Sequence, residues 1–277
     1  MNHSWFTEVR AGKYQINSIQ IYTSLRHEIA IKIDEDIPIS EIIEWISEAT
    51  KYQFLKSFQS KPETGALNNS IGRWNEFITT SLLCELSVNM YDDEERAFAI
   101  FSLPNSTVKP GNPPEFLKLF TKDALQKLLD YSSKIFFPSP DYIVAMIPDI
   151  DMSNQVRNLM TVQIEHPESL EIFNLLKGKL EFENVKSVIS LKTSNRSDRR
   201  YQPSFEAAMI KAIGYFTGVK WKYYMVTGEL RPADRFLFDN VISPHSIALG
   251  THENLVNGIF VYQRKSDLIT LVKAAIR

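Results

Sequence analysis

The chain has 277 residues, a formal net charge of −2 at pH 7 and 44% hydrophobic residues, a composition typical of a folded protein. No stretch approaches the roughly 18 apolar residues that a membrane span needs, and no basic segment with an apolar run opens the sequence, so we expect no membrane partner and a cytoplasmic location. The single cysteine, Cys84, excludes an internal disulfide, and its apolar surroundings favour a buried structural thiol over a nucleophile.

The first third of the chain is predicted to be mostly helical. Apolar residues recur at helical spacing over 39–58, with acids early and lysines late, which predicts one or two amphipathic helices. Residues 62–70 are dense in turn formers and predict a loop that contains Asn69. The segment 71–86 behind it carries a helical apolar stripe and places Glu76 near the start of a helix.

The middle of the chain introduces the first strand pattern. A Pro/Gly-rich loop is predicted over 107–116 and a helix over 120–134. The run YIVAMI at 142–147 is short, aromatic and branched, which predicts a buried strand. Asp141 stands immediately before this strand.

A second strand and a helix follow in the last third. Residues 184–193 alternate as a strand does, so Ser190 and Lys192, two positions apart, leave the same face. The next helix is predicted to have Ser204 as its cap and Glu206 in its first turn.

Further strand patterns lie at 219–230 and 257–264, and a helical pattern closes the chain. Strands that alternate with helices predict an α/β fold with a central mixed sheet flanked by helices. No internal repeat of fixed period is present, which argues against a solenoid or a propeller.

Three residue types suited to phosphodiester hydrolysis converge in this pattern. Asp141 and Lys192 each stand at a strand end, and Glu206 lies on the helix that can fold back over one of them. Carboxylates are the hard ligands that Mg²⁺ prefers, and a lysine can polarise water or stabilise phosphorane charge. A surface ion pair of the same residues is the competing interpretation.

The loop between the strand and the helix concentrates charge at Arg196, Asp198 and Arg199. Arginine can bind guanine O6 and N7 with two hydrogen bonds, and a carboxylate can accept one from cytosine N4. The loop therefore predicts readout of a G·C-rich step in the major groove. Solvated charges beside a helix start are the alternative.

These motifs resemble those of type II restriction endonucleases that cut at sites with a CCGG core. The family has a lysine, then four residues later an R-S-D-R or R-P-D-R tetrad, and beyond it a glutamate on a helix. The matching residues here are Lys192, Arg196, Ser197, Asp198, Arg199 and Glu206. The segments PSPDYIVAMI and GALNNSIGRWNE also carry the resemblance.

The resemblance implies a PD-(D/E)xK restriction-endonuclease-like fold in the variant with a displaced acidic residue. Ser190 stands at the usual acidic position, among the catalytic residues, and Glu206 supplies the carboxylate instead. Asp141 and Glu206 are expected to bind Mg²⁺, and Lys192 to act near the nucleophilic water. Glu76 would add a further catalytic carboxylate, and a structural role for it stays equally open.

The resemblance also assigns the DNA-binding residues. Arg196 and Arg199 would bind the guanines of CCGG, and Asp198 the cytosines. Arg200 lies outside the tetrad and is expected to contact a phosphate. Asn69 lies where relatives approach the minor groove.

The expected activity is Mg²⁺-dependent cleavage of double-stranded DNA at a palindromic CCGG-containing site, before the first C, with a 5′ overhang. Length and an Ile/Lys/Asn-rich composition resemble those of a family member that reads CCGG flanked by A or T, but the sequence itself does not give the flanking bases. A palindromic site has two-fold symmetry, and a protein that recognises it is expected to have the same symmetry. A homodimer or a higher oligomer is therefore expected. Residues 1–62 would form a helical N-terminal region and 63–277 the catalytic and DNA-recognition domain. A sequence-specific DNA-binding protein and a repair nuclease of the same fold remain alternatives.

A second Pro-Asp pair follows the strand of residues 142–147, at Asp149. Asp141 is preferred because its SPD sequence before an apolar run matches the family. The five histidines are scattered without the spacing of metal ligands.

Overall fold

The structure is a computed structural model that describes residues 5–90, 98–104, 115–129, 138–147, 149–192 and 201–277. The chain divides into two compact units. The first comprises Met1–Thr79 and Tyr262–Ser266, and the second comprises Thr80–Val261 and Asp267–Arg277. The assignment of catalysis and DNA recognition to residues 63–277 stays a prediction.

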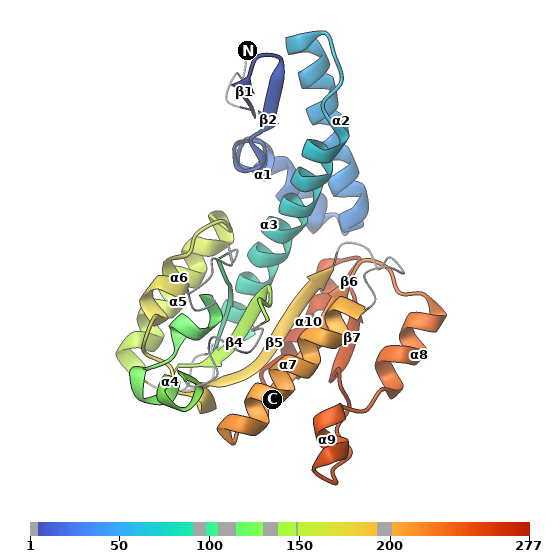
Figure 1. Ribbon diagram of the computed structural model, residues 1–277. Coiled ribbons are helices and arrows are strands. Elements are labelled where there is room, and N and C mark those ends of the chain that lie inside the picture. Colours follow the sequence, from blue (N-terminus) through green and yellow to red (C-terminus); the bar gives the residue numbers. More distant parts are fainter. Residues whose placement is uncertain (1–4, 91–97, 105–114, 130–137, 148, 193–200) are drawn as a thin grey trace. The chain divides into compact units, whose positions relative to one another are not determined.

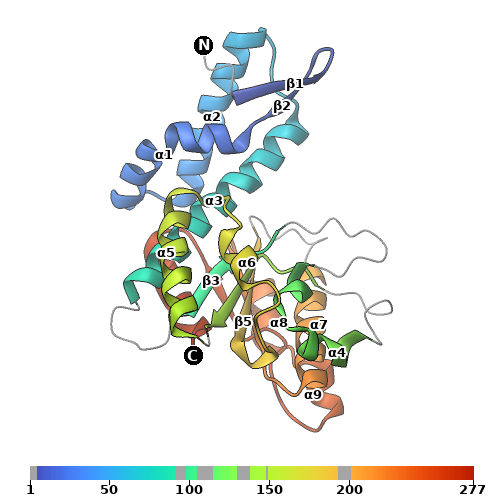
Figure 2. The ribbon, with the colours of Figure 1, turned by 90° about the vertical axis from the view of Figure 1, so that its left-hand side faces the viewer.

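The first unit combines a β-hairpin with helices (Figure 2). Its elements are β1 (Phe6–Arg10), β2 (Lys13–Ile16), α1 (Ser18–Asp34), α2 (Ile39–Phe58) and the first part of α3 (Thr64–Met90). Tyr14 of β2 stacks on Phe58 of α2 with ring centroids 3.8 Å apart. Trp74 of α3 is fully buried, and its indole N–H donates to the Ser18 carbonyl oxygen at 3.1 Å. Buried aromatic side chains thus pack the hairpin against α2 and α3 against α1.

The loop prediction for residues 62–70 is wrong from Thr64 onward, because α3 begins there and contains Asn69. The apolar stripe of the helix starts at the buried Leu67, about two turns before Trp74. The Ser70 hydroxyl donates to the Ala66 carbonyl at 3.1 Å instead of ending the helix. Packing of this stripe outweighs the weak helix propensity of glycine, asparagine and serine.

The second unit is built on a five-stranded sheet in the order β3-β4-β5-β6-β7 (Figure 1). The strands are β3 (Phe98–Ser102), β4 (Tyr142–Met146), β5 (Val185–Lys192), β6 (Lys222–Thr227) and β7 (Gly258–Val261). The pairs β3/β4 and β4/β5 are antiparallel, and the pairs β5/β6 and β6/β7 are parallel. The predicted mixed sheet is therefore confirmed.

Helices lie on both faces of this sheet. The helices of the second unit are α4 (Lys122–Leu129), α5 (Ile150–Glu165), α6 (Glu171–Leu176), α7 (Tyr201–Thr217), α8 (Pro232–Asn240), α9 (Pro244–Ala248), α10 (Lys265–Ala275) and the short 3₁₀ helices η2 (Glu115–Leu119) and η3 (Phe182–Asn184). Neighbouring strand residues point to opposite faces. Tyr223 of β6 accordingly contacts α7, whereas the hydroxyl of Tyr224 donates to the Ala274 carbonyl of α10 at 2.9 Å.

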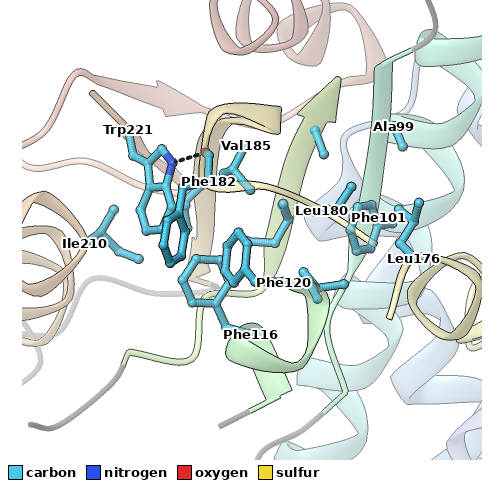
Figure 3. Close-up of a cluster of buried hydrophobic side chains, with 14 of the residues drawn as sticks. Ala99, Phe101, Phe116, Phe120, Leu176, Leu180, Phe182, Val185, Ile210 and Trp221 are labelled. Carbon is cyan, nitrogen blue, oxygen red and sulfur yellow. Dashed lines mark hydrogen bonds between the residues drawn. The ribbon is translucent and has the colours of Figure 1, made fainter. Parts of the chain in front are cut away.

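The core of the second unit is rich in aromatic side chains (Figure 3). Phe116, Phe120 and Phe182 surround Trp221, whose indole N–H donates to the Phe182 carbonyl at 2.9 Å. Burying one such side chain contributes about 1.5 to 3 kcal/mol, and the indole leaves no polar atom unpaired. The core thereby fixes the start of β6 against the segment that leads into β5.

Helix α7 begins at Tyr201, so Ser204 lies inside it and is not its cap, and Glu206 lies in the second turn. Pro203 is compatible with this earlier start because the first N–H groups of a helix have no intrahelical acceptor. The helix ends at Thr217, before Gly218 with φ +83°. A left-handed residue there terminates the helix and directs the chain back toward β6.

Candidate active site at the ends of β4 and β5

Asp141 reaches the end of β5 because β4 and β5 run antiparallel, with Tyr142 paired to Ile189. Its Oδ2 accepts the Leu191 backbone N–H at 2.6 Å and the Ser190 hydroxyl at 3.2 Å. Lys192 places its Nζ 3.8 Å from the same oxygen. Strand pairing and hydrogen bonds thus hold Asp141 beside both residues predicted for the end of β5.

Glu206 enters this group from α7. Only 7% of the residue is exposed, and its Oε2 accepts the hydroxyl of Tyr223 at 2.6 Å. Tyr223 is fully buried in β6, the parallel neighbour of β5. The carboxylate is therefore fixed against the same sheet face from which Ser190 and Lys192 project.

Burial raises the pKa of Glu206 above its ordinary value. The charge of Lys192 and hydrogen bonds from Tyr223 and Ser190 lower it in part, and the charge of Asp141 raises it. Burial and the neighbouring carboxylate also raise the pKa of Tyr223 well above its ordinary value, which keeps its hydroxyl a donor. One lysine thus faces two carboxylates.

The donor set suits a divalent metal ion. In the part of the chain that the structure describes, no group of three or more His, Cys, Asp or Glu residues could hold a metal. Mg²⁺ commonly binds one or two protein carboxylates and takes its remaining ligands from water and substrate phosphate. Asp141 and Glu206 supply such a pair, and an ion would offset the burial cost of the second carboxylate.

A family model described as "Bse634I: Cfr10I/Bse634I restriction endonuclease" matches residues 2–277. The chain belongs to the Cfr10I/Bse634I family. The prediction of a type II restriction endonuclease, a site-specific deoxyribonuclease that binds DNA, is confirmed at this level. Enzymes of this family typically use a divalent metal.

Relatives of the Cfr10I/Bse634I family resemble the chain over most of its length. The type II restriction enzyme Cfr10I of Citrobacter freundii is 25% identical over 218 residues, which cover 73% of this chain and 70% of that protein. The crystal structure of the type IIF restriction endonuclease Bse634I with cognate DNA has a TM-score of 0.80 and 20% identity, with 100% of this chain and 99% of that chain covered. A further structure of Bse634I gives a TM-score of 0.76 at 20% identity. The predicted restriction-endonuclease-like fold is confirmed.

Asp149 has a structural position. Its Oδ1 accepts the Met152 backbone N–H at 2.8 Å, which makes it the N-cap of α5. The choice of Asp141 over Asp149 agrees with this geometry, although the role of Asp141 in the reaction stays a prediction.

Glu76 and Asn69 lie on the part of α3 that belongs to the first unit. The Glu76 carboxylate accepts from Arg73 at 2.8 Å, and Asn69 is exposed. The group of Asp141, Lys192 and Glu206 belongs to the second unit, and the predicted roles of Glu76 and Asn69 stay predictions. The proposed base-reading and phosphate-contacting residues all lie outside the described residues: Arg196, Asp198, Arg199 and Arg200.

Tyr223 is the site residue that the sequence did not predict. A tyrosine within an apolar strand is normally interpreted as a core residue. The partner of its hydroxyl depends on which residue α7 places opposite it. The available signal was the tyrosine pair in KWKYYMVT, since one member of such a pair must face the helix that precedes the strand.

Cys84 is fully buried, and burial raises the pKa of its thiol to about 12. The thiol contacts the Ile100 carbonyl and the Gln163 side chain, so the predicted burial of this thiol is confirmed. Across the described ranges, no helix is both long enough and apolar enough to cross a membrane.

Proposed function

We propose that this chain is a Mg²⁺-dependent restriction endonuclease that cuts double-stranded DNA within a palindromic site with a CCGG core. Cleavage falls before the first C and leaves a 5′ overhang. The observation that carries the proposal is the meeting of Asp141, Lys192 and Glu206 beside the inner strands β4 and β5, in a chain of the Cfr10I/Bse634I family.

Asp141 and Glu206 would hold the metal ion. A bound Mg²⁺ supplies Lewis-acid stabilisation of charge on the phosphate and the leaving oxygen. Lys192, beside Asp141, steadies the attacking water and the developing negative charge. Ser190 holds Asp141 through its hydroxyl and so keeps the carboxylate oriented at the strand end.

Base recognition is assigned to the segment between β5 and α7. Arg196 and Arg199 bind guanines, Asp198 accepts from cytosines, and Arg200 contacts a phosphate. This segment directly follows Lys192 in the chain, and α7 behind it carries Glu206. Recognition and cutting would therefore act on neighbouring nucleotides.

The working unit would be at least a homodimer, because each half of a palindrome presents the same surface to an identical subunit. The relative Bse634I was crystallised with its cognate DNA, which supports duplex DNA as the partner. A cytoplasmic enzyme would encounter such DNA in the cell. Glu76 and Asn69, on α3, are proposed to add a carboxylate near the metal and a minor-groove contact.

Digestion of a DNA of known sequence, followed by sequencing of the fragment ends, tests this function. With Mg²⁺ we expect discrete fragments that all begin within CCGG, and no cleavage by Asp141→Ala or Lys192→Ala. A smear of fragments would instead indicate a repair nuclease. Retention of a CCGG duplex without cleavage in any divalent metal would indicate a DNA-binding protein.

A further inference from the structure

Tyr223 connects the core of the second unit to the candidate metal ligands. It is fully buried near the start of β6, and its hydroxyl donates to Glu206 Oε2 at 2.6 Å. This short bond joins a rigid strand to a carboxylate that projects from α7. A buried carboxylate needs such donors, because the loss of water is costly unless hydrogen bonds replace it.

The register of the sheet places a second hydroxyl on the same face. Tyr223 pairs with Val188 of the parallel strand β5, and Ser190 is two residues further along that strand. Ser190 is fully buried, and its hydroxyl bonds to Asp141 Oδ2. Tyr223 thus holds Glu206, and Ser190 holds Asp141 and also donates toward Glu206.

The neighbouring tyrosine shows what a purely structural role looks like. Tyr224 faces the other side of the sheet, and its hydroxyl donates to a main-chain carbonyl, that of Ala274. Such a bond satisfies the hydroxyl and orients no reactive group. The acceptor of Tyr223 is instead one of the two carboxylates that face Lys192.

We propose that Tyr223 is a positioning residue for the cleavage reaction, which fixes the Glu206 carboxylate so that it and Asp141 bind a divalent metal together. The inference rests on the proposed function of these two carboxylates. Groups that orient metal ligands typically affect metal affinity or activity about 10- to 100-fold when they are removed.

The test compares Tyr223→Phe with the matched control Tyr224→Phe, which removes a hydroxyl from the adjacent residue of the same strand. Binding of Mg²⁺ or Ca²⁺ is measured by calorimetry on the full-length protein without DNA, and cleavage is measured against Mg²⁺ concentration. We expect Tyr223→Phe to weaken metal binding about 10- to 100-fold and to regain most of its cleavage rate at saturating Mg²⁺. Tyr224→Phe should keep wild-type metal affinity.

Equal metal affinity in the two variants overturns the inference, as does loss of cleavage at every Mg²⁺ concentration with metal binding unchanged. If the wild type cuts and loses both cutting and metal binding on Asp141→Ala, the proposed function stands whatever Tyr223→Phe does. If the wild type neither binds metal nor cuts, the proposed function and the inference fail together.

A second measurement does not depend on the folding of Tyr223→Phe. The wild-type chain is labelled with ¹³C at the tyrosine Cζ, at position 223 or at position 224, and metal is added. We expect the Tyr223 resonance to shift with metal binding and the Tyr224 resonance to stay in place. A Tyr223 resonance that does not respond to bound metal contradicts the positioning role.

Discussion

Glu206 places an ionisable carboxyl group where the fold has largely excluded water. Burial raises its pKa, and a carboxyl group with a raised pKa is more easily ionised in the unfolded chain than in the folded one. The stability of the metal-free protein should therefore fall as the pH rises from the ordinary carboxyl pKa through the raised one. The proposed function requires this carboxylate, although a neutral side chain in its place would make the metal-free protein more stable.

Glu206→Gln should therefore melt at a higher temperature than the wild type at neutral pH in EDTA, and should not cut DNA. Glutamine removes the buried charge while its carbonyl can still accept from Tyr223. Thermal unfolding across the pH range checks this prediction. The melting temperature of Glu206→Gln should exceed that of the wild type by more as the pH rises, and the two should be equal in acid. Glu229→Gln, at an exposed position, is the control and should not change the midpoint. A Glu206→Gln midpoint at or below the wild type at neutral pH would contradict the burial argument.

For single residues, the sequence predicts the position of a side chain where that position follows from the two-residue periodicity of a strand. Ser190 and Lys192 could be placed on one face of β5 from their spacing, and both contact Asp141. Tyr223 could not be predicted, because its partner depends on the register between β5 and β6 and on the rotation of α7. Both are set by the packed core.

At the scale of elements, α7 is tied to the segment after α9 through Glu253. Lys211 on α7 is buried, with 4% of its side chain exposed, and its Nζ lies 3.8 Å from the Glu253 carboxylate. Tyr215 and the exposed Lys220 also contact this carboxylate, at 3.0 and 3.2 Å. Partial burial acts to raise the pKa of Glu253, but these hydrogen bonds and charges outweigh it and lower the pKa.

Glu253→Gln should lower the free energy of unfolding by about 1 to 3 kcal/mol at neutral pH, because it leaves the buried Lys211 ammonium without its carboxylate. A carboxyl group with a lowered pKa stabilises the fold above its unfolded pKa and loses this effect as the pH falls through the folded one. The loss measured by urea unfolding should therefore shrink in acid. Lys220→Ala, which removes the exposed partner, should change stability by less than about 0.5 kcal/mol. Equal losses for both variants would show that the buried lysine is not the cause.

Element boundaries illustrate where local sequence preferences fail. Turn-forming residues predicted a loop before Trp74, yet α3 starts at Thr64 because Leu67 extends its buried stripe. Ser204 has a good capping side chain, yet α7 begins at Tyr201. In both cases the helix continues through residues with weak helix propensity, since tertiary packing contributes more than propensity does.

At the scale of the whole molecule, the palindromic site proposed for this enzyme requires two identical cutting centres. Among the described residues, each second unit brings Asp141, Glu206 and Lys192 together, and we propose that this group cuts one strand of the duplex. The alternation of strands and helices predicted this α/β unit, whereas the division of the chain inside α3 had no counterpart in sequence composition. A continuous helix conceals such a boundary.

Mixing the wild type with Lys192→Ala after joint unfolding and refolding should produce mixed dimers that nick the DNA. Each mixed dimer has one intact centre, so a supercoiled plasmid with one CCGG site should accumulate as the open circle before any linear product. Agarose gels of the time course distinguish this from the wild type alone, which should give mainly linear DNA. A mixture that gives only linear and uncut plasmid would indicate that one centre cuts both strands or that the subunits do not pair.

The unit β5–α7–β6 has a consequence for how specificity can change among relatives. Ser190, Lys192, Glu206 and Tyr223 all come from this one continuous stretch, and the proposed base-reading segment lies within it. Asp141 comes from the residue before β4, and the proposed Glu76 and Asn69 come from α3. A recombination event that replaced the stretch would transfer its reading preference together with most of its cutting chemistry, and the recipient would contribute the aspartate before β4 and the residues proposed on α3. New recognition sequences could thus be inherited as a single block.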